Sequence, residues 1–156
     1  FIIMAESIKD LFTKDEREDI RQAILNAELD TSGEIRVHIE DTCSGEVLDR
    51  ASDIFKKLKM HKTERRNGVL FYLAVKNRKF AVLGDKGINA VVEDDFWDDI
   101  KALLLEHFRE EKYAEGLIKG IELVGTKLKN HFPFQTDDVN ELPDDISFGK
   151  QENKEK

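Results

Sequence analysis

The chain of 156 residues is poor in cysteine and proline, with one cysteine and two prolines. A lone cysteine, Cys43, excludes an internal disulfide, so a reducing, cytoplasmic location is the simplest expectation. The sequence has no run that approaches the roughly 18–20 apolar residues of a membrane span, so no span is expected. Residues 1–4 are apolar but too few for the core of a signal peptide.

A strongly basic surface is also missing, because 33 acids outnumber 25 lysines and arginines and give a net charge of −8. Nucleic acids and anionic membranes require positive charge, so neither is expected as a partner. The length predicts one domain with a proper core, which we assign to residues 10–131. Residues 132–156 are rich in acids and are predicted to be an acidic C-terminal tail that is partly disordered.

The most informative stretch of the sequence lies in the middle of the chain. Residues 69–75 form an unbroken apolar run, rich in β-branched and aromatic side chains, which is typical of a strand buried on both faces. A second apolar run at 80–83 follows the polar residues 76–79. Asn77 tolerates a left-handed conformation, so a tight hairpin is expected, and Asn67 followed by Gly68 predicts a turn with positive φ.

Four amphipathic helices are predicted from apolar residues at helical spacing. Their ranges are 14–29, 46–59, a third helix that opens at 93–99, and 113–128. The first starts with the capping-box pattern of Thr13 and Glu16. In the last, Gly116 and Gly120 lie four residues apart, which predicts that the backbone of this helix closely approaches a neighbour. Two strands buried on both faces need helices on each side, so we predict an α/β protein, a three-layer α/β/α sandwich with a small mixed β-sheet.

Residues 34–40 alternate strictly between apolar and polar side chains. This pattern predicts a strand with one solvated face, at or near a sheet edge. Arg36 and His38 would lie on the solvated face rather than form a functional pair. The order strand, helix, strand between residues 34 and 75 predicts a right-handed parallel crossover.

The acids at 93–99 are the best candidates for a binding site. The pairs that would share a helix face at a spacing of four are Asp94 with Asp98 and Asp95 with Asp99. Like charges so close together need compensation, which a hard cation such as Ca²⁺ or Mg²⁺ could supply through oxygen ligands. Alternatively, acids at a helix N-terminus complement the helix dipole, with Asp95 as the N-cap.

Asp41 is a further ligand candidate, because it follows the first predicted strand. The carboxyl ends of strands form the crevice in which open α/β sheets bind ligands. The predicted metal ligands are therefore Asp41, Asp94, Asp95 and Asp98.

Motifs of known catalytic centres are missing, so the catalytic residues stay unknown. A cysteine-phosphatase loop requires an arginine six residues after the cysteine, whereas Asp49 stands there and Arg50 comes one residue late. Cys43 is therefore interpreted as a bystander thiol. The segment from Gly84 to Gly87 lacks the third glycine of a nucleotide fingerprint, and the four histidines lack zinc spacing.

The order of these segments resembles the TPM domain family over about residues 10–130. The segments that carry the resemblance are 32–37, 66–70, Arg78, 84–88 and 113–121. The resemblance implies an α/β/α sandwich and a divalent-cation site formed by acidic side chains beside the sheet. Thylakoid-lumen members of the family are linked to acid phosphatase activity and photosystem II repair. Many members carry a signal peptide and a membrane span or Gly-rich tail; neither is seen here, so an extracytoplasmic or photosynthetic role is not expected.

Two functions follow from the sequence. The first is a non-catalytic interaction module that binds a divalent cation and an unidentified protein partner. The alternative is a metal-dependent, acid-phosphatase-like hydrolase of phosphomonoesters, in which the cation activates water or neutralises the phosphate. The missing nucleophile motif favours the first function, and the family resemblance motivates the second. Arg78 would contact phosphate in the hydrolase and would be a solvated hairpin residue in the binding module.

Overall fold

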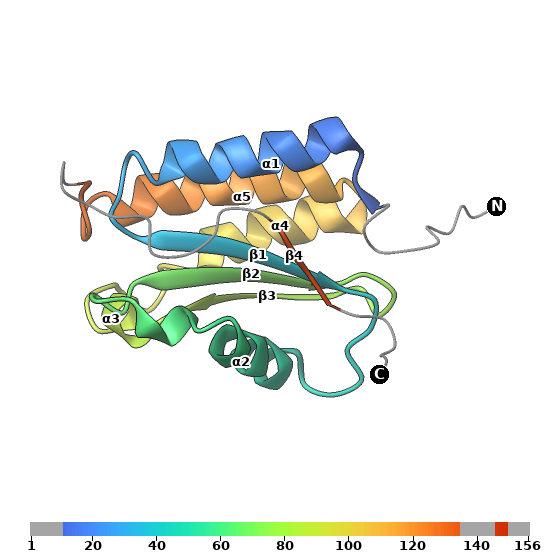
Figure 1. Ribbon diagram of the computed structural model, residues 1–156, viewed down its shortest axis with the longest axis horizontal. Helices are drawn as coiled ribbons and strands as arrows, with labels where there is room; N and C mark the ends of the chain where they lie inside the picture. Colours follow the sequence, from blue (N-terminus) through green and yellow to red (C-terminus); the bar gives the residue numbers. More distant parts are fainter. Residues whose placement is uncertain (1–10, 135–145, 150–156) are drawn as a thin grey trace.

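A computed structural model of the chain describes residues 11–134 and 146–149, which form a mixed four-stranded sheet between two layers of helices (Figure 1). The strands are β1 (Glu34–Glu40), β2 (Gly68–Ala74), β3 (Lys79–Gly84) and β4 (Ser147–Phe148). The helices are α1 (Lys14–Ala27), α2 (Val47–Lys57), α3 (Lys86–Asn89), α4 (Asp98–Arg109) and α5 (Tyr113–Leu128), with the 3₁₀ helix η2 (Met60–Lys62). The predicted α/β/α sandwich is confirmed.

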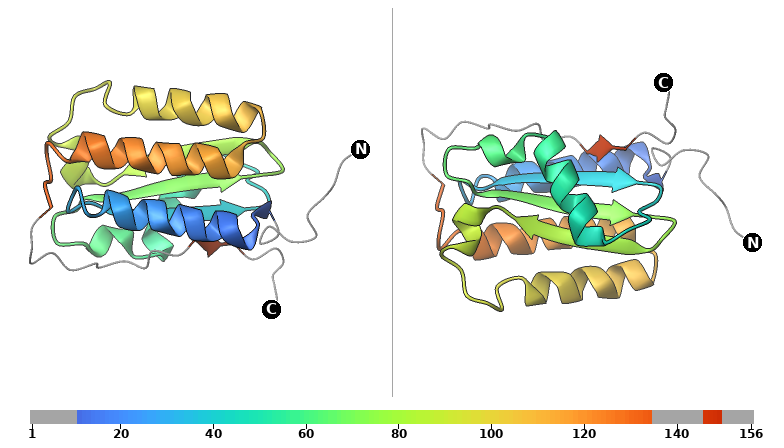
Figure 2. Two further views of the ribbon diagram at one scale, coloured as in Figure 1. Left: turned by 90° about the horizontal axis from the view of Figure 1, so that it is seen from above. Right: turned by 90° about the horizontal axis from the view of Figure 1, so that it is seen from below.

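The helices divide unequally between the two faces of the sheet. Helices α1, α5 and α4 lie side by side over one face, and α2 crosses the other (Figure 2). The side chains of β1 alternate accordingly, with Ile35, Val37 and Ile39 in the core beneath α1 and α5. On the opposite face, Leu70 and Tyr72 of β2 pack with the apolar stripe of α2. None of the described helices has the length and apolar content that crossing a membrane requires.

The sheet order is β3-β2-β1-β4, with β1 parallel to β2 and β2 antiparallel to β3. The predicted parallel crossover and the hairpin are therefore confirmed. Glu40 pairs with Ala74 at the carboxyl ends of β1 and β2. Gly84 pairs with Val69 at their amino ends. The sheet thus has two unlike ends, one carrying the loop after β1 and the other carrying the segment that follows β3.

Strand β1 lies near the sheet edge, as predicted, with the two-residue strand β4 outside it, but the predicted solvated face is wrong. It lies between β2 and β4, and Ser147 of β4 pairs with His38. His38 is 5% exposed, and Arg36 is half-buried. The prediction failed because the covering strand comes from residues more than one hundred positions later in the chain, which no local pattern reveals.

The positive φ angles do not fall on the predicted asparagines. Arg66 has φ 51° and Arg78 has φ 53°, and no glycine among the described residues has positive φ. Asn67 is instead buried, and its carbonyl accepts from Glu34 N at 3.2 Å. Asn77 uses its side chain rather than its backbone freedom, as described below. Both asparagines therefore act through hydrogen bonds and not through a left-handed conformation. Asn67 bonds to β1, and Asn77 bonds to the loop that follows β1.

Several boundaries also differ from the predictions. The capping box of Thr13 and Glu16 is present, and α1 ends at Ala27. Helix α4 starts at Asp98, later than predicted, because residues 91–97 form turns. Residues 135–145 and 150–156 of the predicted tail lie outside the described residues. Within that tail, Ile146 is buried and β4 joins the sheet.

Helix α5 packs closely against its neighbours through glycine, as predicted. A Cβ atom added at Gly116 would lie 2.9 Å from His107 Cβ, and one at Gly120 would lie 3.0 Å from Leu104 Cδ2. Gly125 makes the closest backbone approach: an added Cβ would lie 2.9 Å from Ala27 Cβ and 3.2 Å from its Cα. The glycines therefore set the spacing between α5 and both neighbouring helices.

We expect Gly125→Ala to lower the free energy of unfolding by about 1–3 kcal/mol, because Ala27 is rigid and α1 must shift. The gain in helix propensity, about 1 kcal/mol, opposes only part of this loss. Urea unfolding followed by circular dichroism measures the change. Gly45→Ala is the control, since an added Cβ there meets nothing within 4 Å. Equal stability of the two variants would contradict the packing role of Gly125.

Candidate functional site

A cleft of about 640 Å³ opens at the carboxyl end of β1, between the following loop and α2. Its lining residues are Glu40, Asp41, Thr42, Cys43, Ser44, Gly45, Glu46, Asp49, Arg50, Asp53 and Lys76. This is the position at which open α/β sheets bind ligands. Five of these side chains are carboxylates and two are cationic, so negative charges exceed positive ones by three.

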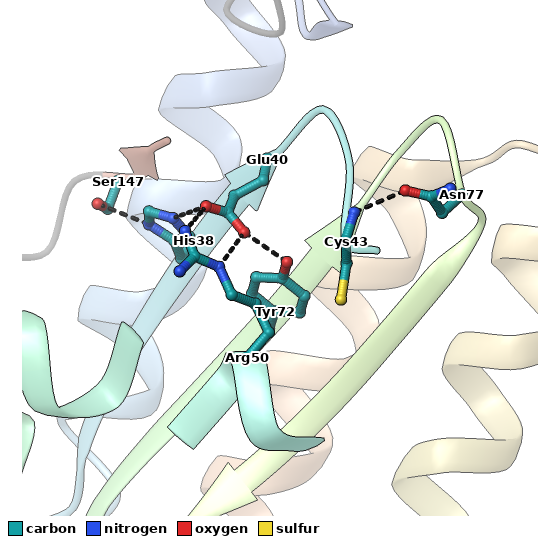
Figure 3. Close-up of polar contacts among 7 residues, drawn as sticks. All are labelled: His38, Glu40, Cys43, Arg50, Tyr72, Asn77 and Ser147. Carbon is teal, nitrogen blue, oxygen red and sulfur yellow. Dashed lines mark hydrogen bonds and ion pairs between the residues drawn. The ribbon is translucent and has the colours of Figure 1, made fainter. Parts of the chain in front are cut away.

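A charge pair of the buried Glu40 and the half-buried Arg50 lies at the floor of the cleft (Figure 3). Arg50 of α2 donates to both carboxylate oxygens of Glu40, from Nε at 2.9 Å and from Nη2 at 2.5 Å. The hydroxyl of Tyr72, from the neighbouring strand, donates to Glu40 Oε2 at 2.5 Å. His38 Nε2 lies 3.7 Å from Glu40 Oε1, beyond hydrogen-bonding distance. The carboxylate therefore has polar neighbours on three sides.

These contacts fix the protonation states of the cluster. Burial alone would raise the pKa of Glu40, but the hydrogen bonds of Arg50 and Tyr72, the contact with His38 and the charge of Arg50 hold that pKa well below its ordinary value. Burial and the hydrogen bond to Glu40 raise the pKa of Tyr72 far above its ordinary value. The hydrogen bond to Glu40 likewise raises the pKa of Arg50. The cluster is thus a fixed ion pair with a neutral phenol.

The C-terminal strand closes one side of this cluster. His38 Nδ1 and Ser147 Oγ are 2.9 Å apart and form a hydrogen bond (Figure 3). Gly149 donates its backbone N–H to the Ile39 carbonyl at 2.8 Å. An added Cβ at Gly149 would lie 2.7 Å from Glu40 Cγ, so only glycine lets this backbone approach the carboxylate so closely.

The loop that forms one wall of the cleft is held by the β2–β3 hairpin. Lys76 donates its backbone N–H to the Asp41 carbonyl at 2.8 Å. Asn77 Oδ1 accepts from Cys43 N at 2.6 Å (Figure 3). Lys79 Nζ donates to the carbonyls of Cys43 and Gly45, at 3.1 and 2.9 Å. Cys43 itself is 4% exposed. The hairpin therefore determines the shape of the loop.

The predicted acidic cluster lies at the opposite end of the sheet from Asp41. Asp94 and Asp95 follow β3 and α3, near the amino ends of β1 and β2, and Asp98 starts α4. All three are exposed. The structure therefore brings Asp94, Asp95 and Asp98 into one region but leaves Asp41 apart from them, in the cleft. Within residues 11–134 and 146–149, no group of three or more His, Cys, Asp or Glu side chains is arranged to hold a metal ion.

The alternative prediction, that these acids cap α4 and complement its dipole, is confirmed only in part. Trp97, not Asp95, occupies the N-cap position of α4 and makes no side-chain capping bond. Asp98 and Asp99 lie in the first helical turn, where they complement the dipole. Asp99 also lies 3.5 Å from Lys127 Nζ on α5. Asp99 therefore has a cationic partner within the protein.

Arg78 lies outside the cleft lining and pairs with Glu111 at 3.2 Å. Both side chains are more than half exposed. This is the solvated hairpin position that the binding-module interpretation expects.

Sequence reasoning missed Glu40, Arg50 and Tyr72 as a cluster. A weak signal was available: a tyrosine within an otherwise apolar buried strand needs a polar partner for its hydroxyl. In the parallel register, His38 pairs with Tyr72. Glu40 pairs with Ala74, two residues further along both strands and on the same face of the sheet. Only the pairing of the two strands identifies that partner.

The sequence model of the TPM domain matches residues 8–127 of this chain. The chain belongs to the TPM domain family. The match includes β1, β2, β3 and the whole cleft, and it ends before β4. No protein with a curated description matches the chain.

Solved structures confirm the fold of this TPM domain. The NMR structure of the BA42 protein from the psychrophilic bacterium Bizionia argentinensis sp. nov. is 46% identical, covers 93% of this chain and 100% of its own, and has a TM-score of 0.87. The N-terminal domain of a P. gingivalis protein has a TM-score of 0.65 at 19% identity, over 78% of this chain and 79% of its own. The N-terminal domain of the Corynebacterium glutamicum protein cg2496 has a TM-score of 0.63 at 13% identity, over 100% and 99%. The last two similarities concern the fold alone.

We expect Glu40→Gln to lower the free energy of unfolding by about 1–2 kcal/mol at neutral pH, because the buried carboxylate loses its charge-assisted hydrogen bonds while Arg50, whose side chain is 35% exposed, keeps access to water. Urea unfolding measures this loss. Asp49→Asn, at the exposed rim of the same cleft, is the control and should change stability by less than about 0.5 kcal/mol.

Wild type and Glu40→Gln also test how the contribution of Glu40 to stability depends on pH. Since the pKa of folded Glu40 is lowered, its stabilising effect is complete above its ordinary pKa of 4.5 and is lost as the pH falls below that value. The stability difference between wild type and Glu40→Gln should therefore shrink below about pH 4.5. A difference that stays constant down to the acid transition would contradict the ionised state of Glu40.

Proposed function

We propose that this TPM domain is a non-catalytic binding module whose cleft takes a divalent cation, Ca²⁺ or Mg²⁺. The observation that carries the proposal is the charge of the cleft, where negative side chains exceed positive ones by three. Arg50 is already paired with Glu40, so Lys76 is the cation that remains at the rim among the lining residues. Such a rim attracts cations and repels anions.

The donor chemistry of the cleft suits a hard cation. Asp41 comes from the loop after β1, and Asp49 and Asp53 come from successive turns of α2. Carboxylate oxygens are the ligands that Ca²⁺ and Mg²⁺ prefer. Because these carboxylates are not gathered into a closed set, a cation held here would keep part of its water shell, as Mg²⁺ usually does.

The groups at the cleft floor favour binding over catalysis, because they are already engaged. Glu40 accepts from Arg50 and Tyr72, and the raised pKa of Tyr72 keeps its phenol neutral. The Cys43 thiol is buried and directed at the Gly45 carbonyl at 3.6 Å. The lowered pKa of Glu40 makes it a weak base, and the neutral phenol and the buried thiol are weak nucleophiles.

A bound cation would connect the loop after β1 with α2 and so stiffen the rim of the cleft. That rim is the surface that we propose a protein partner meets. The cytoplasmic location remains part of the proposal and rests on the single cysteine of the sequence.

The alternative function is a metal-dependent hydrolase of phosphomonoesters. A phosphate dianion would be repelled by the acidic rim unless a cation were bound first, so this activity also requires the cation site. The observation in its favour is the position of the cleft, at the sheet end where α/β enzymes bind substrates.

A cation titration tests the site and compares it with the acidic cluster at the start of α4. We expect Ca²⁺ or Mg²⁺ at about 1–10 mM to shift the backbone amide signals of residues 41–53 in NMR spectra. Asp49→Asn/Asp53→Asn should weaken the affinity about tenfold or more. Asp94→Asn/Asp95→Asn removes the same charge from the other end of the sheet and should leave the affinity unchanged.

The opposite result, with affinity lost in Asp94→Asn/Asp95→Asn and kept in Asp49→Asn/Asp53→Asn, would assign the cation to Asp94, Asp95 and Asp98 as first predicted from the sequence. Equal small losses in both variants would indicate general charge screening and would contradict a defined cation site.

Hydrolysis of a generic aryl phosphate distinguishes the binding module from the hydrolase. We expect no turnover above background with Ca²⁺ or Mg²⁺, because the polar groups at the cleft floor are engaged. The assay follows release of the aryl alcohol with wild type, with chelator and with Asp49→Asn/Asp53→Asn. Turnover that is lost on chelation and in this variant would replace the binding module by the hydrolase.

A further inference from the structure

A second cavity, of about 370 Å³, lies at the other end of α2 from the cleft. Its lining includes Phe55 and Lys56 of α2, His61 of η2, and Leu83 at the end of β3. Most of its wall is apolar, with a few polar groups at defined positions. Both its size and this composition are typical of sites for small molecules.

The lining of this cavity has a net positive charge of one, since Lys56 and Arg66 outnumber Asp85, and further basic residues lie nearby in the sequence. Residues 56–66 contain a single acid, Glu64, among many basic side chains. The basic residues of the segment are Lys56, Lys57, Lys59, Lys62, Arg65 and Arg66. The four lysines are exposed. In a chain with a net charge of −8, this local excess of positive charge would attract an anionic ligand.

One polar atom in the cavity wall lacks a partner. His61 Nδ1 is buried and makes no hydrogen bond within the part of the chain that the structure describes. Because solvent does not reach this nitrogen, a ligand in the cavity would contact another part of the imidazole ring. The backbone on either side of η2 has φ 60° at Lys59 and 51° at Arg66, a conformation that non-glycine residues adopt only at a cost.

The charged groups of the cavity are unequally engaged. Arg66 donates to both oxygens of Asp85, at 2.8 and 3.0 Å, so its charge is balanced within the protein. Lys56 lines the same cavity at the exposed end of α2. An anion that entered would therefore meet Lys56 and His61 rather than compete for Arg66.

We infer that this cavity binds a small anionic molecule with an aromatic or apolar body. The acidic group, a carboxylate or phosphate, pairs with Lys56 and accepts a hydrogen bond from the His61 ring. The apolar body lies against Phe55 and Leu83. This site is independent of the cation cleft and does not depend on the proposed function.

NMR titrations of the full chain test this inference with four probes. Phenyl phosphate and benzoate carry both features, inorganic phosphate lacks the apolar body, and benzyl alcohol lacks the charge. We expect the first two to shift amide signals of Ser52, Phe55, His61 and Leu83, with affinities about tenfold higher than those of the last two. Comparison of phenyl phosphate with benzoate identifies the preferred acidic group.

Variants separate a specific site from general attraction to positive charge. Lys56→Gln should weaken binding of phenyl phosphate about tenfold, whereas Lys57→Gln, an exposed neighbour outside the cavity, should not. His61→Gln should also weaken it, and its amide spectrum shows whether the fold is kept. Asp49→Asn/Asp53→Asn should bind phenyl phosphate as wild type does.

Three results would overturn the inference. Equal losses in Lys56→Gln and Lys57→Gln would reduce the effect to surface charge. Benzyl alcohol binding as tightly as benzoate would remove the role of the anion. Signal shifts confined to the cleft residues, or no shifts with any probe, would show that the cavity is not a binding site.

Discussion

The parallel pairing of β1 with β2 is the constraint on which the remaining features depend. It forces a crossover, and α2 supplies it across one face of the sheet. The two ends of this helix consequently lie over the two ends of the sheet. Asp49 and Asp53 of α2 line the cleft, and Lys56, near the end of the helix, lines the other cavity. One topological requirement thus places two surfaces of opposite charge on a single small domain.

The ion pair of Glu40 and Arg50 connects the fold to the cleft. Arg50 neutralises the charge of Glu40 at the floor of the cleft. The acids at the rim therefore determine the electrostatic field that acts on a ligand. The same pair anchors α2 to β1 beside the carboxyl end of the sheet. Since Tyr72 completes the carboxylate shell, the apolar strand β2 contributes a polar contact at the position where the layers meet. Stability and site geometry therefore share one set of contacts.

The sequence predicted the features that local periodicity encodes. The apolar run of β2, the helical stripes and the glycines of α5 each carry their signal within a few residues, and all were confirmed. The solvated face of β1 was predicted wrongly because Ser147 covers it from a distant position. The acids at 93–99 attracted attention because they are adjacent in sequence. Those of the cleft are spread from Asp41 to Asp53, and only the packing of α2 beside the loop after β1 collects them.

The contact between β4 and β1 has a practical consequence for defining the domain. The TPM match ends at residue 127, whereas Ser147 and Gly149 complete the surroundings of His38 and Glu40. A fragment trimmed to the matched boundary would leave the imidazole without its hydroxyl partner and turn β1 into an open edge. Unprotected edges recruit strands from other molecules and promote aggregation. The contacts that surround His38 and Glu40 therefore extend through Gly149, beyond the matched segment.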